Sequence, residues 1–511
     1  MQELILLLLP MTLLVVIGSL LRRAPPIKEM RTRLAAVKWG LVRDFSAALR
    51  QEVVVTDRVT AHHLLVRGGA GGAFCNRPPT SAASAVLSGQ RHHNITSAPY
   101  GSLWRATRRN LVSEVFHPSC LRLYAPARRA ALCGLVADLR EQCTSKSNDG
   151  VALAAESMHA AMFGLNATMC FGDGVDAGLV RAMADNTEEL IWSLVGVRVF
   201  AALPALTRLI YRERWNKLAA LRRQQEELYL PLINARRGRR RRPSGEAPAY
   251  VDTLIELLVA DERNSAYGGN ASSRKQTLTD GELVGLCSEF LGAGTEPPTA
   301  ELQWIMANLV KHLDVQEAVR TEIEAVVGVD AEEVGEEDLG RLEYLNAVLM
   351  EALRLHPSVP SVVRQVMPED HVVLDGRRVT TGTIVQFQLE CLGRDKTSWA
   401  DPDEFQPERF LASGGGNVVS LVAAAGSAGE IRMMPFGAGR RMCPGMGVAM
   451  LQLGYFVANL VREFEWTEAE GDMAVDLEPH VEFLNFMRRP LRAKLTPLNK
   501  GVGGSGAFSD Q

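Results

Sequence analysis

The sequence lacks paired cysteines. Its eight cysteines are scattered along 511 residues, and no two of them form a CxxC pair. This spacing disfavours a structural zinc site and a disulfide framework, so we expect most of these residues to be buried thiols in a reducing compartment. Only Cys443 has neighbours in the sequence that suggest chemistry.

The sequence also lacks a strong charge of either sign. It has 56 basic and 59 acidic residues, a formal net charge of −3. This balance argues neither for nor against nucleic acid, and we expect no nucleic-acid partner. Hydrophobic residues make up 47% of the chain and charged residues 23%, as in ordinary globular proteins. No internal repeat or shift in composition marks a boundary, so we expect one large domain.

Charged residues are missing from one segment near the N-terminus. Residues 4–21 read LILLLLPMTLLVVIGSLL and are followed by Arg22 and Arg23. As a helix this stretch would be roughly 27 Å long, close to the thickness of a bilayer. It has no evident signal-peptide cleavage site, and the arginines favour a cytosolic chain. We predict a membrane anchor over residues 1–21, most simply in the endoplasmic reticulum; the alternative is a buried N-terminal helix.

The rest of the chain is dominated by helical spacing. A segment that begins at Thr279 has Glu282 three residues later, which is a capping-box pattern, and apolar residues then recur at helical intervals. Between Val362 and Leu389 the pattern changes to β-branched runs around a turn, which predicts a small sheet. The sequence therefore predicts a mainly α-helical fold with a minor β-sheet.

Cys443 lies in the segment PFGAGRRMCPGMGVAM, residues 435–450. A thiolate is a strong metal ligand, and glycines allow a tight turn whose N–H groups can hydrogen-bond the sulfur. A helix that starts directly after the turn also stabilises negative charge. From the residues alone, a buried cysteine in an ordinary turn remains an alternative. A dinucleotide-binding loop does not, because Met442 stands where a third glycine is needed.

The segment resembles the F-x-x-G-x-R-x-C-x-G signature of the cytochrome P-450 superfamily of haem-thiolate monooxygenases. Three further family motifs occur in the expected order, namely WRATR, EALR and PERF. The likeness runs from about Val53 to Pro497, and phrases such as MMPFGAGRR resemble the plant microsomal branch. The residues that carry the signature are Phe436, Gly439, Arg441, Cys443 and Gly445.

The resemblance implies a cytochrome P-450 fold over residues 53–499, haem b as cofactor, and Cys443 as the axial ligand of its iron. It implies electrons from NADPH through a cytochrome P-450 reductase, and insertion of one oxygen atom into a hydrophobic small molecule. Phe436 would shield the thiolate. The remaining family roles are binding of the haem propionates by Trp104, Arg108 and Arg441, and a structural ion-pair network of Glu351, Arg354 and Arg409.

The chain departs from the family on the helix that crosses the haem. The usual A-G-x-D/E-T-T is AGTEPPT here, residues 293–299, so Pro297 replaces the proton-relay threonine and Pro298 follows it. Each proline costs about 3 kcal/mol inside an ordinary helix. Glu296 is retained, and with the nearby hydroxyls of Thr295 and Thr299 it makes up the set of candidate catalytic residues. Regular helical spacing nevertheless points the two threonines away from position 297.

A second departure precedes the domain. The proline-rich hinge of the family is reduced to APP, so residues 22–52 form a divergent linker, and residues 500–511 are expected to be a disordered tail.

Three hypotheses about function follow from these departures: a competent monooxygenase, an enzyme that uses or rearranges a peroxide, and a haem-binding protein with little activity. Pocket contacts are expected from residues 90–103, 290–299 and 357–364, whose apolar bias leaves the substrate unidentified.

Overall fold

The computed structural model describes residues 52–498, apart from 68–73, 79–93, 145–149, 195–199, 201–203, 239–244, 261–274, 369, 371, 375, 413–419, 428 and 470–473. The predicted anchor, nearly all of the linker and the tail lie outside the described residues, so the predictions made for them stay predictions. Within the described ranges, no helix combines the length and the apolar character needed to cross a bilayer.

Helices dominate the described residues. The first half of the chain contains α3 (Arg58–His62), η1 (His63–Arg67), α5 (Ser102–Asn110), η3 (Leu111–Val115), α6 (Pro118–Leu123), α7 (Ala125–Thr144), α8 (Ala154–Phe171), α9 (Ala177–Leu194), α10 (Pro204–Ile210), α11 (Arg212–Arg237) and α12 (Tyr250–Ile255). The second half contains α13 (Asp280–Lys311), α14 (Leu313–Val327), η6 (Leu339–Arg341), α15 (Glu343–Leu355), α16 (Leu389–Gly393), η7 (Pro407–Phe410), α17 (Leu421–Ala424), η9 (Gly439–Arg441) and α18 (Met446–Glu463).

The strands are short and form small sheets. One sheet has the order β1 (Glu52–Val55), β8 (Ile384–Gln388), β5 (Ser361–Gln365), with β1 parallel and β5 antiparallel to β8. A second has the order β2 (Val151–Leu153), β12 (Arg492–Pro497), β9 (Phe464–Thr467). The other strands pair in twos: β3 (Leu258–Ala260) with β4 (Lys275–Thr277), β6 (Val373–Leu374) with β7 (Arg377–Arg378), and β10 (Pro479–Val481) with β11 (Asn485–Met487). The mainly α-helical fold with a small sheet after residue 360 is therefore confirmed.

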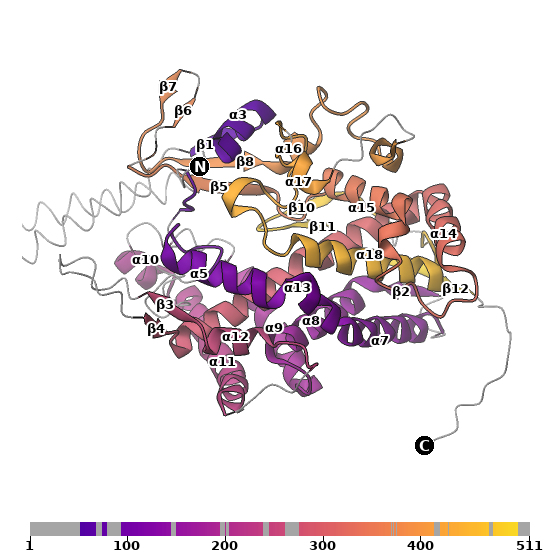
Figure 1. The fold of residues 1–511 in the computed structure, drawn as a ribbon, viewed down its shortest axis with the longest axis horizontal. Coiled ribbons are helices and arrows are strands. Elements are labelled where there is room, and N and C mark those ends of the chain that lie inside the picture. Colours follow the sequence, from indigo (N-terminus) through magenta and orange to yellow (C-terminus); the bar gives the residue numbers. More distant parts are fainter. Residues whose placement is uncertain are drawn as a thin grey trace, which may run out of the picture.

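The long helix α13 runs through the middle of the molecule. In Figure 1, α8, α9, α11 and α12 lie on one side of it, and the β1–β8–β5 sheet with α3 lies on the other. The predicted capping box is present, because the Thr279 side chain accepts from the Glu282 N–H and the Glu282 side chain accepts from the Thr279 N–H. α13 is buried on nearly all sides, as expected for the central helix of a large core.

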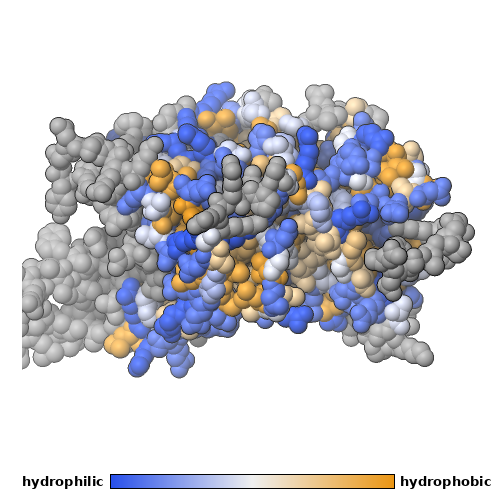
Figure 2. All heavy atoms as spheres, turned by 60° about the horizontal axis from the view of Figure 1, so that its bottom comes forward, coloured by the Kyte–Doolittle hydropathy of each residue, from blue (hydrophilic) through white to orange (hydrophobic). Residues whose placement is uncertain are grey.

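Among the described residues the hydrophobic core has four parts, of which a large one and a smaller one concern the Cys443 turn. The large part collects buried residues of α7, α8, α13, α14, α15 and α18. The smaller part lies against the β1–β8–β5 sheet and reaches the turn that precedes Cys443. On the face in Figure 2, hydrophobic residues form several separate groups amid hydrophilic ones. The two parts of the core thus leave the Cys443 turn between the sheet and the helices.

Candidate active site

The Cys443 turn connects η9 to α18 and is fixed by its backbone. The Cys443 N–H donates to the Phe436 carbonyl at 2.9 Å. Gly437 and Gly439 have φ values of 73° and 68°, in the left-handed region that favours glycine. At Gly439 an added Cβ would lie 2.1 Å from the Leu65 carbonyl oxygen, so no other residue fits there. The glycines are therefore needed to bring the cysteine to the start of α18.

The Cys443 thiol is open on one side and enclosed on the others. Burial raises the pKa of the thiol, while the N–H groups of Gly445 and Met446 and the charges of Arg108 and Arg77 lower it. The residue is nevertheless exposed to solvent. A side chain that is accessible and also deeply enclosed faces a space inside the protein. The nearby N–H groups and cations are what a thiolate ligand needs.

Phe116 connects the Cys443 turn with α13. A Cβ at Gly445 would meet the Phe116 ring at 3.6 Å and the Cys443 sulfur at 3.8 Å, so the ring and the sulfur both lie close to Gly445. The same ring is 5.9 Å from the ring of Phe290 on α13. On α13, Ala293 is exposed although its surroundings are buried. We infer that Cys443 and this face of α13 border the same internal space, and we call it the inner pocket.

Four arginines converge beside the turn: Arg77, Arg108, Arg364 and Arg441. Arg364 is 2% exposed and Arg441 is 5% exposed. Burial and the neighbouring arginines lower the pKa of Arg364 to about 9 and that of Arg441 to about 10. None of the four forms an ion pair with a carboxylate within the described ranges. Glu289 acts on this cluster only by its charge, through Arg77. Buried cations without a direct ion pair are costly, so the cluster fits an anionic group.

Backbone carbonyls and Trp104 hold this arginine cluster in place. Arg441 donates to the carbonyls of Cys75 (2.9 Å), Ile95 (3.2 Å) and Ala98 (2.6 Å). Trp104 on α5 donates to the Ile95 carbonyl, and its ring lies 4.4 Å from the Arg441 guanidinium carbon and 5.3 Å from that of Arg108. The guanidinium of Arg108 donates to the Met442 carbonyl, directly before the cysteine. Trp104, Arg108 and Arg441 therefore lie together, as the sequence motifs suggested.

Sequence reasoning missed two members of the cluster. Arg364 lies on β5 and donates to the Val363 carbonyl, and Arg77 donates to the Thr96 carbonyl. Arg364 belongs to the segment SVVR that was expected to line the pocket, so an arginine in an otherwise apolar strand was the available signal. Arg77 gave no local signal, because only the fold brings it to the other three.

Glu351 on α15 binds two arginines in the core. Its carboxylate accepts from Arg354 at 2.7 and 2.8 Å and from Arg409 of η7 at 3.0 Å. Glu351 and Arg354 have fully buried side chains. Arg354 also donates to the carbonyls of Gly393, Pro402 and Glu404. The network joins α15 to the segment that includes PERF.

α13 continues without interruption through Pro297 and Pro298. In a helix the N–H of residue 298 would bond the Gly294 carbonyl, and proline has none. The side-chain amide of Asn166 on α8 donates to this carbonyl at 2.8 Å and contacts the Thr295 hydroxyl at 3.3 Å. An added Cβ at Gly294 would lie 2.8 Å from Asn166 Oδ1, so glycine permits this approach.

The polar residues beside the prolines point to different partners. Glu296 Oε1 lies 3.0 Å from Nε2 of His159 on α8. Burial lowers the pKa of His159, but the hydrogen bond and charge of Glu296, with Glu188 and Asp185, raise it overall. The Thr299 hydroxyl is buried and has no hydrogen-bond partner among the described groups. Glu296, Thr295 and Thr299 therefore do not converge on one point, and His159 is a contact that the sequence did not suggest.

Glu289 attaches the loop before α5 to α13. Its carboxylate accepts from the N–H groups of Ile95 and Thr96, each at 2.7 Å. Burial raises the pKa of Glu289, and the hydrogen bonds from Thr96 and Ile95 with the charge of Arg77 act in the opposite sense. Two of the segments expected to form the pocket are thus joined here. Residues 90–93 of that loop lie outside the described residues.

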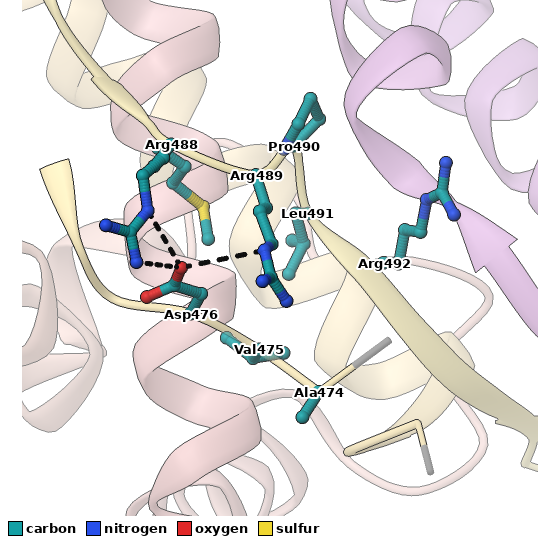
Figure 3. Close-up of a pocket in the computed structure, with 9 residues that line it drawn as sticks. Ala474, Val475, Asp476, Arg488, Arg489, Pro490, Leu491 and Arg492 are labelled. Atoms are coloured by element: carbon teal, nitrogen blue, oxygen red, sulfur yellow. Dashed lines mark hydrogen bonds and ion pairs between the residues drawn. The ribbon is translucent and has the colours of Figure 1, made fainter. Parts of the chain in front are cut away.

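A separate cavity of about 270 Å³ lies between residues 474–476 and 487–492. Figure 3 shows the Asp476 carboxylate between Arg488 and Arg489, with Arg492 pointing away. The Asp476–Arg488 distance is 2.9 Å and the Asp476–Arg489 distance is 3.9 Å. This cavity shares no lining residue with the Cys443 turn or α13 and is not part of the site described above.

Comparison with known proteins agrees with this arrangement. The family model described as "Cytochrome P450" matches residues 10–497. The chain is 37% identical over 470 residues to "Cytochrome P450 89A9" of Arabidopsis thaliana, covering 91% of this chain and 88% of the relative. It is 32% identical over 406 residues to "Flavonoid 3'-monooxygenase CYP75B3" of Oryza sativa subsp. japonica, covering 78% and 73%.

Solved structures support the fold. A zebra fish cytochrome P450 with progesterone has a TM-score of 0.67 and 21% identity, over 87% of this chain and 93% of that chain. A structure of a zebra fish cytochrome P450 with abiraterone has a TM-score of 0.66. The cysteine turn, the buried Glu351 network, the family model and the plant relatives together establish that this chain belongs to the cytochrome P450 family of haem-thiolate monooxygenases.

Proposed function

We propose that the protein is a plant microsomal monooxygenase that inserts one oxygen atom of dioxygen into a hydrophobic small molecule, with electrons from NADPH through a membrane-bound reductase. The observation that carries this proposal is an enclosed thiol, open toward the inner pocket, beside N–H groups and four arginines. The proposed setting is the endoplasmic reticulum membrane, with the anchor at residues 1–21 and the catalytic domain in the cytosol.

The residues beside the turn fit haem b. Cys443 would ligate the iron, and the N–H groups of Gly445 and Met446 would stabilise the thiolate. Arg108, Arg364 and Arg441 would bind the propionates, which supply the negative charge that this cluster lacks. Phe436 would shield the sulfur from water. When bound, the haem supplies the activation of dioxygen, and the chain supplies the ligand, the electrostatic setting and the exclusion of water.

Substrate would enter the inner pocket on the other side, against α13. Ala293 and Pro297 present apolar surface on this face, and the bonds from Ile95 and Thr96 to Glu289 join the loop before α5 to α13. Glu296 is held by His159 of α8, whose side chain is 23% exposed. Such a pocket suits an apolar compound of small-molecule size. We propose no single substrate.

Pro297 favours a second candidate function. A hydroxyl at this position is the family's proton-relay group, and proline cannot replace it. Neither Thr295 nor Thr299 takes its place, because Thr295 is bonded to Asn166 and Thr299 lies two positions away on the helix. An enzyme that takes its oxygen from a peroxide, or rearranges one, needs neither that hydroxyl nor a reductase.

The deciding experiment is expression of the full chain in microsomes with a plant reductase. The absorption band of the reduced, carbon-monoxide-bound protein reports thiolate ligation, and Cys443→Ser should abolish it while Cys391→Ser, at an exposed cysteine, should not. Turnover of a panel of hydrophobic compounds is then compared with NADPH and with added peroxide. Product from NADPH supports the monooxygenase, and product from peroxide alone supports the second candidate.

Either the absence of the thiolate band in the wild type or an unchanged band in Cys443→Ser would overturn both candidates. A normal band without product from NADPH or peroxide would favour a haem-binding protein without this activity.

A further inference from the structure

Glu301 is an acidic residue of α13 that the mechanism above does not use. It follows Pro297 by four residues, and Pro297 follows Ala293 by four. Residues four apart lie one turn above another on the same helix face. Ala293 is exposed and Pro297 is half-buried, whereas Glu301 is 1% exposed. Glu301 therefore lies one turn beyond the proline, buried in the protein next to the face of α13 that carries Ala293 and Pro297.

One oxygen of the Glu301 carboxyl is bonded and the other is not. Oε2 accepts from the Ser358 hydroxyl at 2.7 Å, and Ser358 lies between α15 and β5. Oε1 is buried and has no hydrogen-bond partner among the described groups. Burial raises the pKa of Glu301 to about 8, although the hydrogen bonds from the Ser358 side chain and backbone lower it. Burial therefore favours the protonated, neutral form of this carboxyl.

The proton belongs on Oε1, because Oε2 is already an acceptor. A buried O–H donor without an acceptor costs about 1–3 kcal/mol. Apolar surroundings can keep a carboxylic acid neutral so that it donates a hydrogen bond in an active site. The unpartnered Oε1 thus indicates an acceptor that the protein itself does not provide.

A second unpartnered atom lies beside Ser358. The N–H of Asn485 donates to the Ser358 carbonyl at 2.8 Å, and its side-chain amide contacts the Pro357 carbonyl at 3.4 Å. Asn485 Oδ1 is also buried without a partner among the described groups, and Asn485 is 3% exposed. Glu301 and Asn485 both contact the Pro357–Ser358 segment. An acid O–H and an amide oxygen are suitable partners for a water molecule, which accepts from one and donates to the other.

We propose that Glu301 is a neutral carboxylic acid which, with Ser358 and Asn485, binds a water molecule at the edge of the inner pocket and holds there the exchangeable proton that Pro297 cannot provide. The proposal rests on the proposed function. In this step the bound water takes the Oε1 proton and passes one of its own protons to the oxygen being reduced in the inner pocket, which leaves Glu301 as a carboxylate. A proton from solvent then returns through the same water to Oε1. Glu301 would thereby act from the next turn of the helix in place of the missing hydroxyl.

The first test measures the protonated carboxyl directly by infrared spectroscopy of the holoprotein. The reduced, carbon-monoxide-bound protein is photolysed at neutral pH, and the difference spectrum is recorded in H₂O and D₂O. We expect a band of a protonated carboxyl that moves on photolysis, shifts in D₂O and disappears in Glu301→Gln. Glu317→Gln, at an exposed ion pair on α14, is the matched control and should retain the band. Absence of the band in the wild type would overturn the proposal.

The second test measures the use of the proton. Glu301→Gln keeps the size of the side chain but cannot release a carboxyl proton, so product formation should fall by about 100-fold, at the low end for general-acid groups. Ser358→Ala should shift the carboxyl band without removing it. If the wild type shows the carboxyl band but Glu301→Gln forms as much product as the wild type, the role of Glu301 in proton supply is overturned.

The two tests separate this proposal from the proposed function. The infrared band needs no substrate or reductase, so it reports on Glu301 even where NADPH-driven turnover fails. A normal carbon-monoxide band in Glu301→Gln shows that the variant has folded and bound its cofactor. If Glu301→Gln lacks the carbon-monoxide band, Glu301→Met takes its place, with the same expected loss of the carboxyl band and of product formation.

Discussion

The side-chain amide of Asn166 donates to the backbone carbonyl of Gly294 at 2.8 Å and so replaces the N–H that Pro298 lacks. The bond joins α8 to α13, which pack together in the large part of the core. It explains how an uninterrupted helix accommodates two consecutive prolines, which local propensity alone would disfavour.

We expect Asn166→Ala to lower the free energy of unfolding by about 1–3 kcal/mol, because the Gly294 carbonyl would be left buried without a donor. In a Pro298→Ala background the backbone N–H returns, so the same change should cost less. A double-mutant cycle by chemical denaturation measures the difference, expected to be about 1 kcal/mol or more. Equal costs of Asn166→Ala in both backgrounds would show that the amide does not replace the proline's N–H.

The buried Glu351 carboxylate binds two arginines, so its removal should lower the free energy of unfolding by a large amount. Glu351→Gln is expected to lower the stability by about 3–5 kcal/mol, because Arg354 would remain buried without its counter-charge. Glu408→Gln is the control, since its carboxylate lies in the neighbouring η7 and bonds the Tyr344 hydroxyl at an exposed site. Thermal unfolding of both variants checks this, and a similar small loss in the two would contradict it.

Pro297→Thr restores a hydroxyl at the family's relay position. Glu301 acts from one turn further along the helix, so a hydroxyl at position 297 itself should raise the amount of product formed per NADPH consumed. Pro298→Thr places the hydroxyl one residue away and should not raise the ratio. Parallel measurement of product, NADPH and hydrogen peroxide checks the prediction, and an unchanged ratio in Pro297→Thr would refute it.

His356 should make the fold sensitive to acid. Its ring stacks on Trp304 with centroids 4.2 Å apart, and burial, with the charges of Arg394 and Arg354, lowers its pKa to about 3. The unfolded chain takes up this proton near pH 6.5, whereas the native state remains unprotonated. Stability contributed by neutral His356 is therefore present above pH 6.5 and falls between pH 6.5 and 3, by a few kcal/mol in total.

Denaturation of wild type and His356→Phe at pH 7 and pH 5 measures this effect. The wild type should lose more stability on acidification than the variant, which keeps the stacked ring. His63→Gln, at an exposed position, should behave like the wild type. Glu301 contributes the opposite slope, because its raised pKa means that stability is lost as the pH rises from 4.5 toward 8. An equal acid sensitivity of wild type and His356→Phe would exclude His356 as its source.

Gly439→Ala should disrupt the cysteine turn, because the new Cβ would collide with the Leu65 carbonyl and the φ of 68° would be strained. We expect loss of most of the bound haem and of the carbon-monoxide band. Gly447→Ala in the first turn of α18 meets nothing within 4 Å and should retain both. Spectra of the two purified variants check this, and an intact band in Gly439→Ala would show that the turn tolerates the change.

Features with a local cause could be predicted from the sequence. The capping box at Thr279, the strands after residue 360 and the glycine turn around Cys443 depend on residues that are close together in the chain. Glu351 and Arg354 are three apart, so their contact also follows from helical spacing. The third member, Arg409, could be assigned only through the family motif.

Contacts between distant segments could not be predicted in this way. Asn166 and Gly294 are separated by 128 positions, and His159 and Glu296 by 137. No periodicity encodes which side chain of α8 meets which turn of α13. For the same reason Glu301 looked like an ordinary helix residue, because its raised pKa depends on burial and on Ser358.

The bond between Glu289 and the N–H groups of Ile95 and Thr96 bears on how compounds reach the pocket. Swinging the 94–97 segment away from α13 would break two hydrogen bonds and strand a buried carboxyl. The wall formed by the 94–97 segment should therefore stay in place while a ligand enters or leaves. The opposite wall would then limit the size of the compounds that can enter, because only that wall can move to make room for them.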